Sequence, residues 1–156
     1  MTDDIRQWVA DLNHVEPLRR WQAMVALREG GAAAVPALVV ALRHAEVEVR
    51  WRAAVLLGWV GDASAIEPLS ALLGEGYEVK INAVWALGQV ADTAAQPWLL
   101  DTLRNAGENE PDIRYVAALA LARQHQLTAL EDALRSDDLP VYRVAHAALA
   151  AAAYLV

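Results

Sequence analysis

The sequence predicts an all-α solenoid of about ten helices in about five helical pairs, with no strand. Two observations carry this expectation: an internal repeat runs through the chain of 156 residues, and each repeat contains two amphipathic helical patterns. A repeat of about 30 residues is typical of solenoids, in which each unit buries its apolar face by stacking on its neighbours. We therefore expect residues 1–156 to form a single repeat domain.

The repeat is visible when five alanine-rich segments are aligned. They read "RRWQAMVALR" from residue 19, "VRWRAAVLLG" from residue 49, "VKINAVWALG" from residue 79, "IRYVAALALA" from residue 113 and "VYRVAHAALA" from residue 141. The aligned leucines are Leu27, Leu57, Leu87, Leu121 and Leu149, with spacings of 30, 30, 34 and 28 residues. The longest spacing contains the extra residues of "NAGENEPD", and a solenoid tolerates added length in such a connection.

A second helical pattern lies between consecutive aligned segments. Its apolar residues recur at i, i+3, i+4 and i+7, as Val35, Leu38, Val39 and Leu42 do. Prolines near the start of these patterns, and glycine or aspartate before them, mark the helix boundaries. An opening helix is expected through about Asn13.

Charge and composition exclude several classes of partner. The formal net charge is −7, and no basic run is longer than Arg19-Arg20, which argues against nucleic acid. The chain has no cysteine, so disulfides, thiolate zinc sites and a cysteine nucleophile are excluded. It shows neither a signal peptide nor the apolar stretch of about 20 residues that a membrane span needs. We expect a cytoplasmic protein that binds neither nucleic acid nor membrane.

One segment carries a specific family resemblance. Residues 46–73, "EVEVRWRAAVLLGWVGDASAIEPLSALL", resemble the short HEAT-type repeat of phycobilisome-lyase-like proteins. The matching residues are Val49, Arg50, Ala53, Ala54, Leu57, Gly58, Gly61, Asp62, Ala65, Ile66, Pro68 and Leu69. The designed alpha-Rep scaffolds are similar to this repeat. The resemblance implies a right-handed α-α superhelix.

The aligned helix of the second repeat has two apolar faces. At 100° per residue, Val49, Ala53 and Leu57 cluster on one side with Val60 and are expected to form the core face. The opposite side carries a second apolar stripe, Trp51, Val55 and Trp59. The equivalent positions of the other repeats are Trp21, Val25 and Glu29; Ile81, Trp85 and Gln89; Tyr115, Leu119 and Arg123; and Arg143, Ala147 and Ala151. A helix that is apolar nearly all round is usually covered on more than one side.

In the alpha-Rep scaffolds the outward positions of this helix form a concave, target-binding surface. By that resemblance the partner-binding residues here are Trp21, Val25, Trp51, Arg52, Val55, Trp59, Ile81, Asn82, Trp85, Gln89, Tyr115, Leu119 and Arg123. The apolar members would lie along one groove, with Arg52, Asn82, Gln89 and Arg123 orienting the partner. A few large aromatics dominate the energy of many recognition surfaces, so we expect a protein or peptide partner.

Two further roles for the apolar stripe are compatible with the sequence. In the first, the stripe forms the contact between copies of a homo-oligomer. In the second, other parts of the same chain pack over it. The C-terminal helix, "LPVYRVAHAALAAAAYLV", is a further candidate for contact between copies, since it is apolar over most of its surface. Trp8 and Trp98 fall on core phases of their own helices and are predicted to be structural.

The sequence assigns no catalytic residue, cofactor or metal. Deoxyhypusine hydroxylase resembles this repeat and binds di-iron through His-Glu dipeptides. The equivalent places here hold Trp21-Gln22, Trp51-Arg52, Ile81-Asn82 and Tyr115-Val116, which excludes that activity. "HVE" at residues 14–16 and "HAE" at residues 44–46 are interpreted as turns rather than metal sites. A bilin-binding or bilin-lyase-like accessory protein remains the alternative function, although lyases of that type are longer and commonly work as two-subunit complexes.

Polar residues at the repeat positions have structural roles. Arg20, Arg50, Lys80 and Arg114 occupy one position, and they are expected to form an inter-repeat ladder with neighbouring acids or carbonyls. Asp62 and Asp92 are expected to cap the helices that follow them.

Overall fold

The computed structural model describes residues 2–90, 92–107 and 109–152. Its helices are α1 (Thr2–Asp11), α2 (Pro17–Glu29), α3 (Val35–Ala41), α4 (Val47–Val60), α5 (Ile66–Ser70), α6 (Tyr77–Gln89), α7 (Gln96–Asn105), α8 (Pro111–Arg123), α9 (Leu127–Ala133) and α10 (Leu139–Ala152). Short 3-10 turns precede α3, α5 and α7, and another follows α5. These residues contain no strand, so the predicted all-α fold of ten helices in five pairs is confirmed.

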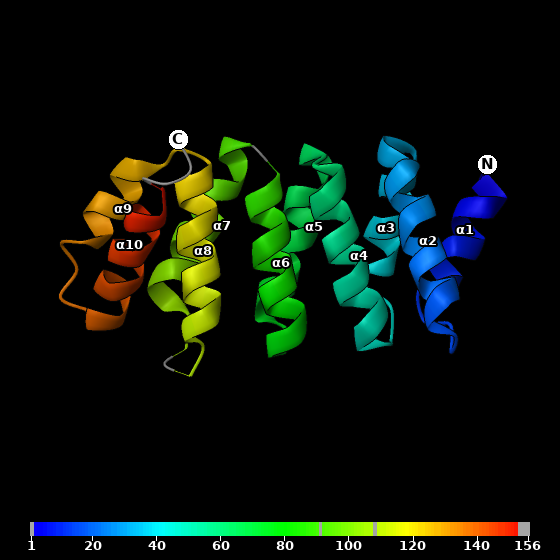
Figure 1. Cartoon of the computed structure of the whole chain (residues 1–156), viewed down its shortest axis with the longest axis horizontal. Coiled ribbons are helices and arrows are strands. Elements are labelled where there is room, and N and C mark those ends of the chain that lie inside the picture. Colours follow the sequence, from blue (N-terminus) through cyan, green and yellow to red (C-terminus); the bar gives the residue numbers. More distant parts are fainter. Residues whose placement is uncertain (1, 91, 108, 153–156) are drawn as a thin grey trace.

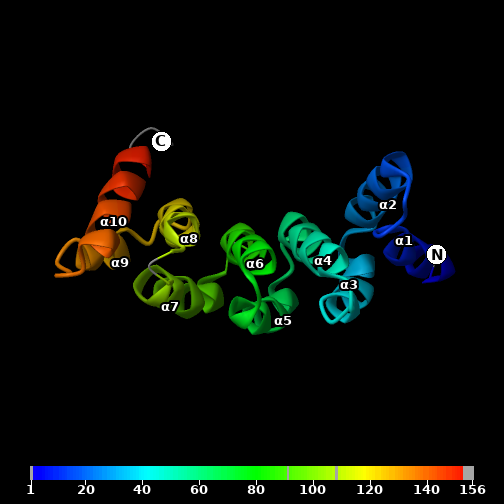
Figure 2. The same ribbon diagram turned by 90° about the horizontal axis from the view of Figure 1, so that it is seen from below.

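The helices form two rows that follow the same curve (Figures 1 and 2). The odd-numbered helices make the outer row, and α2, α4, α6, α8 and α10 make the inner row on the concave side (Figure 2). Each inner helix packs on its outer partner and on the next inner helix. The aligned segments of all five repeats therefore lie side by side on one face.

Local sequence sets the helix boundaries. Asp62 accepts a hydrogen bond from the backbone N–H of Ser64, and Asp92 accepts one from Ala94, so both aspartates cap the 3-10 turns that lead into α5 and α7 as predicted. Gly61 ends α4 at a φ of 71°, in the left-handed region that favours glycine. Proline is the first or second residue of five helices, at Pro17, Pro36, Pro97, Pro111 and Pro140.

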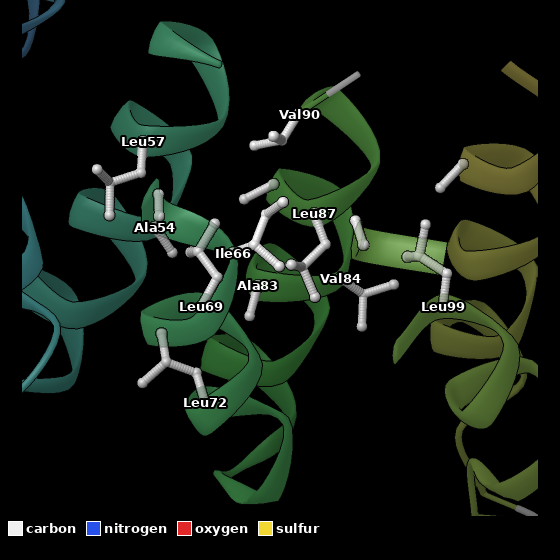
Figure 3. Close-up of a cluster of buried hydrophobic side chains, with 14 of the residues drawn as sticks. Ala54, Leu57, Ile66, Leu69, Leu72, Ala83, Val84, Leu87, Val90 and Leu99 are labelled. Carbon is white, nitrogen blue, oxygen red and sulfur yellow. The ribbon is translucent and has the colours of Figure 1, made fainter. Parts of the chain in front are cut away.

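The core is a continuous layer between the two rows. Figure 3 shows part of it, where Leu57 of α4, Leu69 of α5 and Leu87 of α6 lie close together. The aligned leucines of the first four repeats are fully buried, whereas Leu149 in the last repeat is half-buried. Regular burial at one repeat position explains why the sequence period predicted the fold.

One of the two tryptophans predicted to be structural is exposed. Trp8 of α1 packs against the core, as expected. The prediction for Trp98 is wrong, because this side chain is 38% exposed. Leu99 and Leu103 take the core positions of α7 and turn Trp98 outward.

Basic side chains anchor three inner helices, α2, α4 and α8, to carbonyls at or just after the end of the outer helix before them. Arg20 Nη1 donates a hydrogen bond to the carbonyl of His14 at 2.6 Å, and Arg50 Nη1 donates to His44 at 2.8 Å. Arg114, which is 5% exposed, donates to three carbonyls at and just after the end of α7. These contacts satisfy carbonyls that a helix leaves unpaired at its C-terminus.

The basic residues at this repeat position also link neighbouring repeats. Three of its cations pair with a carboxylate of the following repeat: Arg50 with Glu75 at 3.2 Å, Lys80 with Glu110 at 2.6 Å and Arg114 with Asp138 at 3.7 Å. The predicted inter-repeat ladder is thereby confirmed.

Two glycines allow inner helices to approach closely. A Cβ atom on Gly58 of α4 would lie 2.8 Å from the Cα of Ala86 in α6. A Cβ atom on Gly88 of α6 would collide with the Cβ of Ala120 in α8. The equivalent residue of α2 is Arg28, so this device is missing from the α2–α4 junction.

No single described helix combines the length and the apolar composition that crossing a membrane requires. Pro17–Glu29 and Gly31–Ala41 meet the length and composition criteria only when taken together, and they are bent by 117°. Leu27 and Leu38 of this pair are buried in the core.

Candidate functional site

The residues predicted to bind a partner lie on the inner row, but their exposure differs. Trp21 is 62% exposed, Trp59 is 43% exposed and Tyr115 is 37% exposed. Arg123 is also exposed. The half-buried members are Val25, Trp51, Arg52, Val55, Ile81, Asn82, Trp85, Gln89 and Leu119. The three exposed aromatic side chains come from three different inner helices and stand at the surface of the inner row.

One hollow lies between α2 and α4. It has a volume of about 220 Å³ and is lined by Trp21, Met24, Val25, Arg28 and Trp59. The guanidinium carbon of Arg28 lies 5.3 Å from the ring centroid of Trp59. This is a cation–π distance, so Arg28 is held against the aromatic wall of the α2–α4 hollow.

A larger hollow lies across α6, α8 and α10. It has a volume of about 420 Å³, and its walls include Trp85, Tyr115, Leu119 and Ala151. Arg123 Nη2 donates a hydrogen bond to Gln89 Oε1 at 3.1 Å, and both residues line the hollow. The α6–α8–α10 hollow is therefore apolar, with one polar pair at its wall.

The two hollows are separated by a pair of tryptophans. Trp59 lines the α2–α4 hollow and Trp85 lines the α6–α8–α10 hollow. Their ring centroids are 6.4 Å apart and their planes are perpendicular, which is an edge-to-face contact. The surface expected as one groove thus contains two hollows that share a wall.

Three of the predicted apolar residues line neither of these hollows. Trp51 and Ile81 pack against the core, and Val55 is half-buried. Trp51 also lies beneath Arg52, whose guanidinium carbon is 4.7 Å from the Trp51 ring centroid. The middle of the predicted stripe is therefore partly covered by the protein itself.

The other two predicted orienting side chains, Arg52 and Asn82, also have partners within the chain. Arg52 Nη1 donates to the carbonyl of Leu12 at 2.8 Å, and Asn82 Nδ2 donates to the carbonyl of Glu78 at 2.7 Å. Burial lowers the pKa of Arg52, and the nearby charge of Arg20 lowers it further. These contacts fix both side chains before any partner arrives.

Sequence reasoning missed Arg28 as a residue of the site. The predicted stripe takes three outward positions per helix, and Arg28 occupies a fourth. The sequence does contain a signal for it. Arg28 stands at the repeat position that holds glycine in the next two inner helices, at Gly58 and Gly88. Met24 was missed because its chemistry is that of an ordinary core residue, and Ala151 was placed on the stripe but not among the partner-binding residues.

The recurring His-x-Glu sequences form turns, as interpreted from the sequence. His14 Nδ1 accepts a hydrogen bond from the backbone N–H of Glu16 at 3.1 Å, and His44 does the same with Glu46 at 3.1 Å. In the part of the chain that the structure describes, no three His, Cys, Asp or Glu residues are grouped to hold a metal ion.

Comparison with known proteins identifies the class of this solenoid. The family model described as HEAT repeats matches residues 5–78 and 75–152, so the chain belongs to the HEAT repeat family. A search of curated protein sequences found no match.

Three solved structures illustrate the similarity of fold. The CpcE–CpcF complex of phycocyanin lyase from Nostoc sp. PCC7120 contains a chain that matches at a TM-score of 0.75 and 22% identity, over 96% of this chain and 99% of that chain. Human deoxyhypusine hydroxylase matches at 0.64 and 22% identity, over 94% of this chain and 61% of that chain. A designed armadillo repeat protein in complex with the peptide (KR)4 matches at 0.55 and 22% identity, over 94% and 80%.

The lyase comparison corrects one expectation drawn from the sequence. Phycobilisome lyases were expected to be longer than this chain, yet the match covers 99% of the lyase chain. Chain length therefore does not separate this protein from that class.

Proposed function

We propose that this protein is a non-enzymatic adaptor that binds a protein or peptide on the concave face of its inner row. The observation that carries the proposal is the exposure of Trp21, Trp59 and Tyr115 around two apolar hollows on one face. Large aromatics beside a depression are typical of binding hot spots. Membership of the HEAT repeat family supports a scaffold role.

Trp21 and Trp59 give the most direct test. The wild type and a Trp21→Ala/Trp59→Ala variant are immobilised, and proteins captured from a lysate of the parent organism are quantified by mass spectrometry. Burial of one such side chain contributes about 2 kcal/mol, so the double variant is expected to lose the specific partner.

Trp98→Ala is the matched control. This tryptophan has an exposure close to that of Trp59 but belongs to α7 of the outer row. The control is expected to capture the same proteins as the wild type. Equal capture by the Trp21→Ala/Trp59→Ala variant, with its helical circular dichroism intact, would contradict the proposal.

Contact between copies is the competing use of the same face. Light scattering is expected to give the mass of one chain for the wild type under the adaptor proposal. A dimeric wild type that becomes monomeric on Trp21→Glu substitution would make this face a homodimer seam instead.

A bilin-binding accessory role is the second candidate. It is favoured by the α6–α8–α10 hollow, which offers about 420 Å³ with aromatic walls. Mixing the purified protein with a linear tetrapyrrole tests it. The adaptor proposal expects an unchanged absorption spectrum, whereas a shifted and intensified band would favour bilin binding.

A further inference from the structure

The charges around the two hollows restrict the chemistry of a partner. Among the residues that the structure describes, Arg28 is the one charged side chain that lines the α2–α4 hollow, and Arg123 is the one that lines the α6–α8–α10 hollow. Both arginines are exposed and lie in the last turn of their helices, α2 and α8. The partial negative charge at a helix C-terminus favours a cation there. Each hollow thus combines an apolar pocket with one fixed positive charge.

The other ends of the inner helices carry both signs of charge. Glu48, Glu78 and Asp112 lie in the first turns of α4, α6 and α8, and all three are exposed. A cation of the basic ladder follows each of them two residues further along the helix, so neither sign prevails at these ends. The hollows differ, because the described charge at each hollow is an arginine.

The arrangement of the hollows sets a spacing for the partner. One lies between α2 and α4, and the other is centred two helices further along the row. Neighbouring packed helices are about 10 Å apart, so the hollows are about 20 Å apart. An extended chain advances about 3.3 Å per residue, so about six residues span this distance.

We propose that the concave face binds an extended acidic peptide segment through two apolar anchors about six residues apart. One anchor fills each hollow, and an aspartate or glutamate beside each anchor pairs with Arg28 or Arg123. The bulkier anchor enters the α6–α8–α10 hollow, since that hollow is the larger. The segment crosses the wall formed by Trp59 and Trp85. This inference rests on the proposed function and specifies its partner.

The net charge of −7 does not oppose this choice. At physiological ionic strength the Debye length is about 8 Å, so distant carboxylates are largely screened from a peptide in the hollows. A carboxylate in contact with Arg28 or Arg123 responds mainly to that arginine.

The test uses three fluorescein-labelled synthetic peptides of about twelve residues. The first has tryptophan and leucine anchors about six residues apart with glutamates beside both anchors. The second replaces the glutamates with lysines, and the third replaces the anchors with glycines. Fluorescence anisotropy with the full chain is expected to show binding of the first peptide alone, and this binding should weaken as salt is added.

Two double variants locate the charges. Arg28→Gln/Arg123→Gln is expected to weaken binding of the first peptide about tenfold. The matched control Arg43→Gln/Arg104→Gln removes two exposed arginines outside the hollows, from the turn after α3 and from α7, and is expected to leave binding unchanged. Circular dichroism verifies that both variants keep their helices.

The outcomes separate this inference from the proposed function. Equal binding of the lysine peptide, equal loss in the control variant, or no binding of the first peptide would overturn the acidic, two-anchor partner. The concave-face adaptor survives each of these results if partner capture still depends on Trp21 and Trp59. It fails if that capture is independent of both tryptophans.

Discussion

The inner helices pack differently at the α2–α4 junction than at the α4–α6 and α6–α8 junctions. At α4–α6 and α6–α8, a glycine of one helix faces an alanine of the next, as Gly58 faces Ala86. By register, the pair at α2–α4 is Arg28 and Leu56. The closed junctions bring helix backbones together, and at α6–α8 the close-packed Gly88 and Ala120 themselves line the larger hollow. At α2–α4 it is the side chain of Arg28 that lines the hollow.

The residue at this repeat position therefore affects how closely two inner helices pack and what lines the hollow above them. Glycine at that position removes the side chain and lets the neighbouring helix fill the space. Arginine keeps the helices from closing there, and its long side chain lies over the ring of Trp59 instead. A solenoid can therefore change its binding face by single substitutions without losing its repeat.

The largest expected effect comes from one substitution made at two equivalent positions. Gly88→Leu is expected to lower the free energy of unfolding by about 3 kcal/mol, because Ala120 already occupies the space of a Cβ atom. Arg28→Leu is expected to change stability by less than about 0.5 kcal/mol, since position 28 faces a hollow. Urea denaturation followed by circular dichroism measures both. Equal effects would show that the two junctions do not differ as described.

The sequence predicted the fold well because the fold depends on repeated features. The leucine period, the alternating helices, the caps at Asp62 and Asp92 and the basic ladder each recur at fixed spacing, and local rules suffice to read them. Trp98 was misassigned because Leu99, Thr102 and Leu103 form the buried face of α7 and Trp98 lies beside that face rather than on it. A large apolar residue next to the core face is not distinguished from a core residue by its chemistry alone.

The site was predicted less completely because it depends on how far helices stand apart. The outward positions were found, but their exposure ranges from half-buried Ile81 to Trp21 at 62%. No single helix encodes the edge-to-face contact of Trp59 with Trp85 that divides the surface. Such features follow from helix spacing, which Gly58 and Arg28 control from neighbouring helices.

The tryptophans give the second comparison. Trp85 is half-buried and packs on Trp59 and close to Gly58, so Trp85→Ala is expected to cost about 2 kcal/mol of stability. Trp21→Ala is expected to cost less than about 0.5 kcal/mol, because Trp21 is largely exposed. Thermal denaturation of both variants tests this order. A large loss for Trp21→Ala would mean that Trp21 serves the core rather than the surface.

Substitutions in the basic ladder test whether the N-terminal ends of the inner helices are equally anchored. Arg114→Met is expected to cost about 1.5 kcal/mol, because it leaves three carbonyls near the end of α7 without their donor. Arg20→Met in α2 is expected to cost about 1 kcal/mol, since Arg20 is less buried and donates to two carbonyls of the turn between α1 and α2. A negligible effect of Arg20→Met in urea denaturation would show that these contacts do not stabilise the start of α2.

The smallest expected effect concerns the ion pair at the closed α6–α8 junction. Hydrogen bonds from Lys80 Nζ and from the backbone N–H of Gly107 hold the pKa of Glu110 below its usual value of 4.5. The ionised carboxylate therefore stabilises the folded state above that usual value, and this contribution is lost as the pH falls through the lowered pKa. Glu110→Gln is expected to cost about 0.5 kcal/mol at neutral pH and nothing in acid below the lowered pKa.

Urea denaturation of the wild type and of Glu110→Gln at both pH values measures this difference. Glu67→Gln on the exposed side of α5 serves as the control and is expected to match the wild type at neutral pH. A cost that persists in acid would assign the role of Glu110 to packing rather than to charge. In that case helix contact alone would stabilise the closed junctions. They would then differ from the α2–α4 junction only in having glycine where α2 has Arg28.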